Sequence, residues 1–194
     1  MLGMSIGKNF KMQSIEVDAK IVAQAIDDQL SGKTSMLSDS QAQNLMMTFQ
    51  NDMKGKLEAK QKELGEKNKK EGAEFLAANK KKDSVKTTAS GLQYKVLKMG
   101  TGKKPTGDQT VSVNYRGTLV DGTEFDNSFK RGQPATFALS QVIKGWTEGL
   151  ELMPLGSKWM LYIPPELGWG EQGEGHVIPP NATVIFEVEL LEIK

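Results

Sequence analysis

Proline is absent from the first 104 residues of this 194-residue chain, and all seven prolines come later. Because proline ends helices and interrupts the centre of a sheet, its absence permits one very long helix in the first half. Ten of the thirteen aromatic residues and fourteen of the twenty glycines lie after residue 90, whereas seven of the ten methionines lie before residue 54. A shift of composition this large indicates two regions of different structural class.

The start of the chain has the spacing of apolar residues that is typical of amphipathic helices. Asp18 is placed to cap a helix whose last apolar residue is Leu30, and Gly32 is placed to end it. We therefore predict that residues 1–37 form short helices.

A longer helix follows. Ser38 and Gln41 form a capping box at its start. From residue 54 to residue 82 the sequence is rich in lysine and glutamate, and a helix that polar cannot bury most of its length. We predict a solvent-exposed rod over residues 38–82, roughly 40 residues and about 60 Å long at 1.5 Å per residue.

The short helices within residues 1–37 contain too few apolar residues to form a core of their own. Pairing with a second copy of the chain would bury them, and methionine suits such an interface because it packs adaptably. A small intramolecular helical cap is the alternative. We favour a homodimerisation region, because a long solvated helix needs an anchor at its end.

The second half has the two-residue alternation of strands rather than helical spacing. Residues 83–90 have no period and are predicted to be a linker. Within residues 91–194 one short segment breaks the alternation: Val142, Trp146 and Leu150 are spaced by four, which predicts one helix over Gln141–Leu152. The predicted strands are Gln93–Leu97, Val111–Arg116, Trp159–Ile163 and Val184–Leu190. The fold class is therefore α+β, with an antiparallel sheet wrapped around one helix.

Composition excludes several kinds of site. No cysteine is present, so thiol catalysis and thiolate metal sites are excluded, and a single histidine excludes a multi-histidine metal site. A net charge of +1 gives no overall attraction to nucleic acid. No apolar run reaches the ~18–20 residues that cross a bilayer. We expect a soluble protein without cofactor or metal and without nucleic-acid binding.

The glycines of residues 168–173 have the spacing of a dinucleotide-binding loop. That motif needs a strand before it and a helix after it, but Pro164–Pro165 precede it and Pro179–Pro180 follow it. We therefore predict a surface loop. His176 lies in the same region, where no nucleophile-elbow motif accompanies it.

Aromatic residues are plentiful in the second half and polar candidates for catalysis are few. The rings could form only a core, or they could also line an apolar pocket in which Asp126 and Arg131 supply polarity. Composition alone leaves both readings open.

Longer motifs decide between them. In order and spacing they resemble the FK506-binding family of peptidyl-prolyl isomerases, and the match runs from about Ser90 to Lys194. The first half resembles the helical dimerisation region and long linking helix of the Mip/FkpA-like bacterial branch. The matching motifs are Val113–Leu119, Asp121–Asp126, Arg131–Pro134, Val142–Leu150, Ile163–Leu167 and Ile178–Thr183.

The resemblance implies a half-open sheet around the short helix and a V-shaped homodimer. Carried over by motif, the catalytic residues would be Tyr115, Phe125, Asp126, Trp146 and Phe186. The residues that bind substrate or macrolide would be Arg131, Phe137, Val142, Ile143, Trp169 and Ile178. Trp146 would be the floor under the proline ring, the Ile143 N–H would hold a substrate carbonyl, and Asp126 would be oriented by Tyr115 and Arg131. Trp169 stands where the family usually has a tyrosine.

The resemblance further implies an isomerase that rotates Xaa-Pro bonds of unfolded or partly folded client proteins and that FK506 and rapamycin inhibit. No covalent catalysis is needed. The alternative is a dimeric holdase chaperone that binds clients between its arms and isomerises weakly. Exported relatives favour the periplasm or cell surface, and the cytoplasm stays open.

Overall fold

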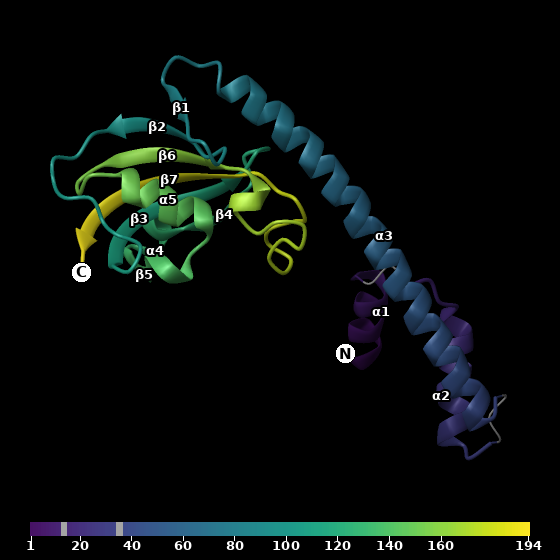
Figure 1. The fold of residues 1–194 in the computed structure, drawn as a ribbon. Helices are drawn as coiled ribbons and strands as arrows, with labels where there is room; N and C mark the ends of the chain where they lie inside the picture. Colours follow the sequence, from purple (N-terminus) through teal and green to yellow (C-terminus); the bar gives the residue numbers. More distant parts are fainter. Residues whose placement is uncertain (13–14, 34–36) are drawn as a thin grey trace. The chain divides into compact units, whose positions relative to one another are not determined.

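The computed structural model describes residues 1–12, 15–33 and 37–194, and it divides into two compact units, residues 1–55 and residues 56–194. The first unit is helical and the second is built on a sheet (Figure 1). Helix α3 (Asp39–Asn79) passes from one unit to the other without a break. Among the described residues, no helix is both long and apolar enough to cross a membrane.

Helices α1 (Leu2–Met12) and α2 (Ala19–Leu30) precede α3 in the first unit. The carboxylate of Asp18 caps α2 by accepting a hydrogen bond from the N–H of Lys20 at 2.8 Å. Gly32, with a φ of 66°, follows the last turn of α2. Both ends of this helix are therefore where the sequence predicts them.

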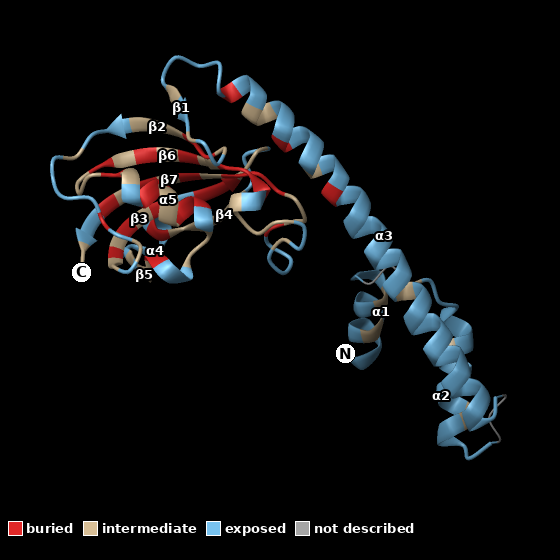
Figure 2. Cartoon of the chain, in the orientation of Figure 1, coloured by how far each residue is buried: buried red, intermediate tan, exposed pale blue. Residues whose placement is uncertain are grey.

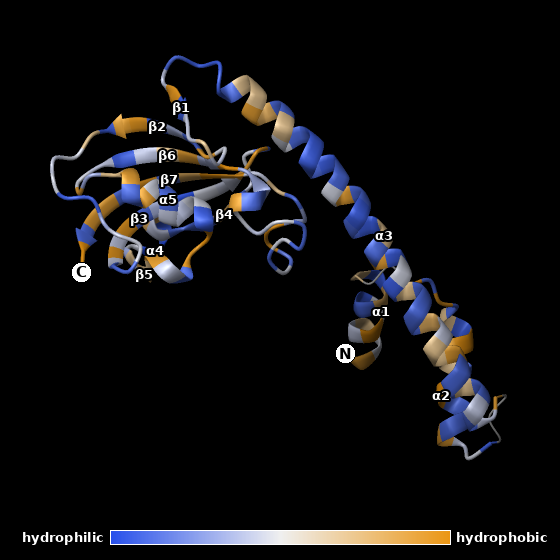
Figure 3. Ribbon diagram, viewed as in Figure 1, coloured by the Kyte–Doolittle hydropathy of each residue, from blue (hydrophilic) through white to orange (hydrophobic). Residues whose placement is uncertain are grey.

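The capping box of α3 is also confirmed. The N–H of Ser38 donates to Oε1 of Gln41 at 2.9 Å, and the N–H of Gln41 donates to Oγ of Ser38 at 3.3 Å. The helix that follows has 41 residues, most of them hydrophilic (Figure 3). The predicted long helix is present.

Most of α3 is exposed, as predicted for a solvent-exposed rod, but three residues of its second half are buried against the rest of their own unit. Gly65, Gly72 and Asn79 are buried (Figure 2). The side-chain amide of Asn79 donates to Oε1 of Gln93 at 3.0 Å. A contact made through glycines leaves no apolar stripe in the sequence, and this is why helical periodicity did not indicate it.

Seven strands form one antiparallel sheet in the second unit, which confirms the predicted α+β class. They are β1 (Val85–Thr87), β2 (Gln93–Lys98), β3 (Thr110–Leu119), β4 (Glu124–Asn127), β5 (Ala135–Ala138), β6 (Lys158–Ile163) and β7 (Val184–Ile193). Their order is β1-β2-β6-β7-β3-β4, and β5 also pairs with β3. The long strands β3 and β7 pair from Val111↔Ile193 to Leu119↔Val184 and form the centre of the sheet.

Helix α5 (Lys144–Leu152) lies in the curve of this sheet (Figure 1). Two of its glycines bring it close to β6. A Cβ at Gly145 would lie 2.6 Å from Cγ2 of Ile163, and one at Gly149 would lie 2.8 Å from Cδ1 of Leu161. The alternating residues of β3 and β7 complete the core beneath the helix, where Val113 is fully buried.

Two boundaries differ from the prediction. Helix α5 begins at Lys144 instead of Gln141, because the backbone of Ile143 is extended, with φ −61° and ψ 148°. Residues 83–90, predicted to be a linker, contain β1, which pairs with β2. Three residues are too few for strand alternation to be visible in a sequence.

Candidate active site

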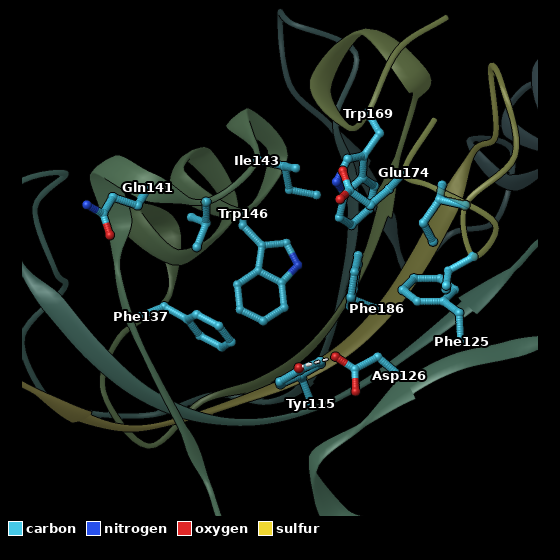
Figure 4. A pocket seen from close by; sticks show the side chains of 13 residues that line it. Tyr115, Phe125, Asp126, Phe137, Gln141, Ile143, Trp146, Trp169, Glu174 and Phe186 are labelled. Carbon is cyan, nitrogen blue, oxygen red and sulfur yellow. Dashed lines mark hydrogen bonds between the residues drawn. The ribbon is translucent and has the colours of Figure 1, made fainter. Parts of the chain in front are cut away.

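An open cavity of about 420 Å³ lies in the second unit, and its lining is mostly aromatic and aliphatic (Figure 4). Ten of the eleven site residues assigned by resemblance line it, and the eleventh, Arg131, is hydrogen bonded to two of the ten, Tyr115 and Asp126. The structure therefore brings these residues together, while their catalytic and binding roles stay predictions.

Trp146, on helix α5, forms the floor of the cavity. Three rings meet its indole nearly at right angles, at 82° to 87°, with centroid distances of 5.1 Å to Tyr115, 5.4 Å to Phe137 and 5.1 Å to Phe186. Edge-to-face packing of this kind favours one orientation of each ring. The floor is therefore a fixed apolar surface.

The outer wall depends on a glycine in β3. A Cβ at Gly117 would lie 2.6 Å from the ring of Phe125 and 2.8 Å from that of Phe186, so no larger residue leaves both rings in place. The two rings pack edge to face at 5.5 Å. Trp169 meets Phe125 at 6.3 Å and an interplanar angle of 87° and so extends the wall.

The polar corner of the cavity is built by a tight turn after β4. The side chain of Asn127 caps the short helix α4 (Ser128–Arg131), which returns the chain so that Arg131 faces Asp126. The hydroxyl of Tyr115 and the guanidinium of Arg131 both donate to the Asp126 carboxylate, and Arg131 also donates to the Tyr115 oxygen at 2.9 Å. The N–H of Asn127 adds a fourth bond, at 2.8 Å to Oδ1 of Asp126.

These bonds set the ionisation of the corner. Partial burial acts to raise the pKa of Asp126, but the hydrogen bonds from Tyr115 and Arg131 outweigh it, and the pKa lies below its ordinary value. Burial, reinforced by the bond to Asp126, raises the pKa of Tyr115. Near neutral pH the corner therefore holds a carboxylate, a neutral phenol and a guanidinium.

Ile143 presents its backbone to the cavity just before α5. Its carbonyl accepts the first helical bonds, from the N–H of Trp146 at 2.9 Å and of Thr147 at 3.2 Å. Within the described part of the chain its own N–H donates to no protein atom. The cavity lining therefore includes a residue whose backbone N–H has no acceptor among the residues that the structure describes.

Three lining residues were not predicted: Gln141, Glu174 and Val177. The last two lie in the turn closed by the bridge between Glu174 and Ile178, where the N–H of Glu174 donates to the Ile178 carbonyl at 2.8 Å. The alternation and helical spacing that mark elements carry no information about such a turn. His176, in the same turn, is exposed.

The glycine-rich segment 168–173 is a loop, as predicted. Gly168 ends the short 3-10 helix η2 (Pro165–Leu167), and the N–H of Gly170 donates back to the Pro165 carbonyl at 2.9 Å. No helix opens on these glycines, so the loop has no cradle for a pyrophosphate.

Comparison with known proteins identifies the two halves separately. A family model described as FKBP-type peptidyl-prolyl cis-trans isomerase matches residues 101–191. A second model, described as the domain amino terminal to FKBP-type peptidyl-prolyl isomerase, matches residues 1–96.

Curated relatives match along the whole chain. Outer membrane protein MIP of Legionella longbeachae is 44% identical over 193 residues, which cover 100% of this chain and 83% of that protein. FKBP-type peptidyl-prolyl cis-trans isomerase FkpA of Escherichia coli K12 is 40% identical over 200 residues, covering 100% and 73%. The crystal structure of FkpA from Escherichia coli superposes with a TM-score of 0.83 at 40% identity and covers 100% of this chain and 91% of that one. The chain therefore belongs to the FKBP-type peptidyl-prolyl cis-trans isomerases.

Proposed function

We propose that the aromatic cavity of the second unit is the site at which this isomerase rotates Xaa-Pro bonds of unfolded and partly folded proteins. The observation that carries the proposal is the floor of Trp146, which three rings meet edge to face. Ile143, whose N–H has no acceptor among the described residues, lines the same cavity. In this proposal a proline ring packs on the floor, and the carbonyl of a neighbouring residue accepts a hydrogen bond from the Ile143 N–H.

The chemistry requires no nucleophile. Rotation about an Xaa-Pro bond faces a barrier of ~18–20 kcal/mol, because amide resonance must be broken. The twisted amide has a less polarised carbonyl than the planar one, so a dry apolar pocket favours the twisted form relative to water. A millionfold acceleration would require roughly 8 kcal/mol of such preference.

The polar corner would act by holding the Asp126 carboxylate in one orientation. Asp126 is held by Tyr115 and Arg131, and its carboxylate stays charged at neutral pH. We assign Tyr115, Phe125, Asp126, Trp146 and Phe186 to catalysis. The residues assigned to binding of substrate or of FK506 and rapamycin are Arg131, Phe137, Val142, Ile143, Trp169 and Ile178.

The experiment is the cis-to-trans rate of an Xaa-Leu-Pro-Phe peptide, with and without rapamycin. We expect fast conversion that the macrolide blocks. Asp126→Ala should lower kcat/KM about 10- to 100-fold, the range for a lost hydrogen bond to a charged group. Asp108→Ala, on an exposed turn, is the matched control and should leave the rate unchanged. Equal rates for the two variants would show that the chemistry occurs elsewhere.

A second activity, holding unfolded clients as a dimer, is favoured by the first unit. Helices α1 and α2 contain no buried residue, and large apolar side chains are exposed on all three helices, including Leu2, Ile21, Leu30 and Phe49. Exposed apolar surface of this kind marks an interaction site. We propose that a second copy of the chain covers it and that clients bind between the arms.

Sedimentation tests the dimer directly. Ile21→Glu places a charge on a side chain that is 67% exposed in the single chain and should convert a dimer into a monomer. Lys20→Glu, one residue away, is the charge control and should stay dimeric. A wild-type monomer at micromolar concentration would refute the proposal. Suppression of client aggregation by wild type, lost in Ile21→Glu, would support holding between arms.

We further propose export to the periplasm or cell surface. A relative that is 44% identical along the whole chain carries the name outer membrane protein MIP. Fractionation of cells that express the native gene tests the placement, and recovery with cytosolic markers would refute it.

A further inference from the structure

The loop that forms one side of the cavity is in contact with a helix that lies outside the isomerase fold predicted from the sequence. Trp169 and Ile178 of this loop line the cavity. Ile178 is two residues from Pro180, which α3 contacts. The residue that follows Trp169 is hydrogen bonded to Asn181, another residue that α3 contacts. We propose that Asn68 of α3 is a positioning residue for the active site, acting through the loop.

The contact begins with a hydrogen bond from the helix. The side-chain amide of Asn68 donates to the backbone carbonyl of Pro180 at 2.9 Å. Asn68 is half-buried although its neighbours Lys67 and Lys69 are exposed, so its side chain faces the loop. Proline has no N–H of its own, and its carbonyl is the hydrogen-bonding group that its backbone offers to the helix.

Glycines allow the helix to approach the loop. A Cβ at Gly65 would lie 3.2 Å from Cβ of Pro180 and 3.2 Å from Nδ2 of Asn181, and one at Gly72 would lie 2.3 Å from Oγ1 of Thr183. With Asn68 between them, the helix therefore contacts residues 180, 181 and 183 through a side without large side chains. A cavity of only about 60 Å³ remains at this junction.

A second hydrogen bond passes the constraint toward the cavity. The N–H of Asn181 donates to the carbonyl of Gly170 at 2.9 Å, and Gly170 follows Trp169 directly. Asn181 has a φ of 54°, the left-handed region that asparagine tolerates better than most residues. At the other end, Pro180 is two residues from Ile178, which is 2% exposed. Asn68 therefore fixes the backbone from which both lining side chains project.

The inference rests on the proposed site, because it matters for catalysis only if Trp169 and Ile178 contact the substrate. Removing the bond should loosen the loop without removing any group that touches the substrate. We therefore expect KM to rise about three- to fivefold, which corresponds to the loss of one neutral hydrogen bond. We expect kcat to stay near the wild-type value.

The test compares full-length Asn68→Ala with Asn51→Ala, which changes an exposed asparagine of the same helix and gains the same helix propensity. Asn68→Asp keeps the shape but cannot donate when ionised. We expect both Asn68 variants, and not Asn51→Ala, to raise KM for the proline peptide. The amide of Asn181 should exchange its hydrogen faster in the same two variants.

Several results would overturn the inference. KM and Asn181 exchange equal to those of Asn51→Ala would show that the bond holds nothing. Faster exchange with unchanged KM would show that the braced loop does not position the site. Trp169→Ala separates the two proposals. If Trp169→Ala raises KM and Asn68→Ala does not, the positioning role of Asn68 is wrong. If neither variant raises KM, the assignment of the cavity is wrong as well.

Discussion

The ionisation of two side chains sets how the cavity responds to pH. Burial acts to raise the pKa of Asp126, but its hydrogen bonds outweigh burial and leave the pKa below its ordinary value. Folding therefore favours the charged form of this carboxyl group. Its contribution to stability is present above the ordinary pKa and is lost as pH falls through the folded one. Burial raises the pKa of Tyr115, whose contribution is present below its ordinary pKa and is lost as pH rises through the folded one.

We therefore expect kcat/KM to be flat from about pH 5 to pH 9 and to decline only outside that range. Asp126→Asn carries no ionisable group at this position and should lose the acid decline, although its rate is lower throughout. Rates measured across the range in buffers of constant ionic strength check this. A decline of kcat/KM inside this range would contradict the prediction.

The second prediction at the scale of residues concerns the hydrogen-bond donor at Trp169. An indole donates only through its ring N–H, whereas a tyrosine hydroxyl donates from the tip of the ring. Trp169→Tyr should therefore tighten rapamycin binding about fivefold, the value of one added hydrogen bond. Trp169→Phe has no donor at all and serves as the control. Calorimetric titration that gives Trp169→Tyr and Trp169→Phe the same affinity would contradict the prediction.

At the scale of elements, helix α3 has glycines in two different surroundings, one exposed to solvent and one packed against the rest of the unit. A Cβ added at Gly55 meets nothing within 4 Å, whereas one added at Gly72 meets Thr183 at 2.3 Å. The substitution Gly→Ala gains up to about 1 kcal/mol of helix propensity at either position. At Gly72 the clash should cost about 1–3 kcal/mol and reverse the sign.

Thermal denaturation followed by circular dichroism should therefore show a higher Tm for Gly55→Ala than for the wild type, and a lower Tm for Gly72→Ala. Two stabilised variants would mean that the helix does not dock on the sheet in solution.

The elements also show what could be predicted from the sequence. Strands β3 and β7 were found because one of their faces is buried and the other is not, so alternation survives in the residue pattern. The docking of α3 was missed because its buried residues are Gly65, Gly72 and Asn79, which no hydrophobicity pattern singles out. Phe75 also contacts the sheet, but one aromatic residue in a polar helix does not make an apolar stripe. Val142 and Ile143 kept helical spacing although their backbone is extended, so α5 was predicted to begin too early.

The cavity divides in the same way. Its rings and polar corner are carried by motifs on strands and helices, and these motifs located them. Gln141 reaches the cavity from a 3-10 turn whose first residue, Leu139, is hydrogen bonded to the Gln109 carbonyl. Glu174 and Val177 reach it from a loop closed by the bridge between Glu174 and Ile178. Such bonds leave no signal in residue spacing.

At the scale of the whole molecule, the boundary between the units decides where the chain can be cut. Residues 56–79 of α3 belong to the isomerase unit, where the ring of Phe75 packs on Tyr162 at 6.0 Å and the Gln93 amide donates to the Leu76 carbonyl at 2.9 Å. A chain that begins at residue 83 loses these contacts. A chain that begins at residue 56 keeps them.

We expect the chain of residues 56–194 to keep the peptide isomerase activity of the full protein. The chain of residues 83–194 should melt about 10 °C lower than that of residues 56–194, because each kcal/mol of lost stability lowers Tm by several degrees in a domain of this size. Differential scanning calorimetry of the two truncations measures the gap. Equal melting temperatures would show that α3 adds nothing to the fold of the catalytic unit.

The unbroken course of α3 across the boundary at Gly55 also makes the isomerase unit transferable. Because the helix enters the unit as regular backbone, another helix joined in phase at this position would continue it without a loop to design. A coiled coil of chosen strand number, fused there, would display two, three or four isomerase units at a set spacing. The isomerase unit of this protein is in this sense a module that carries its own helical attachment point.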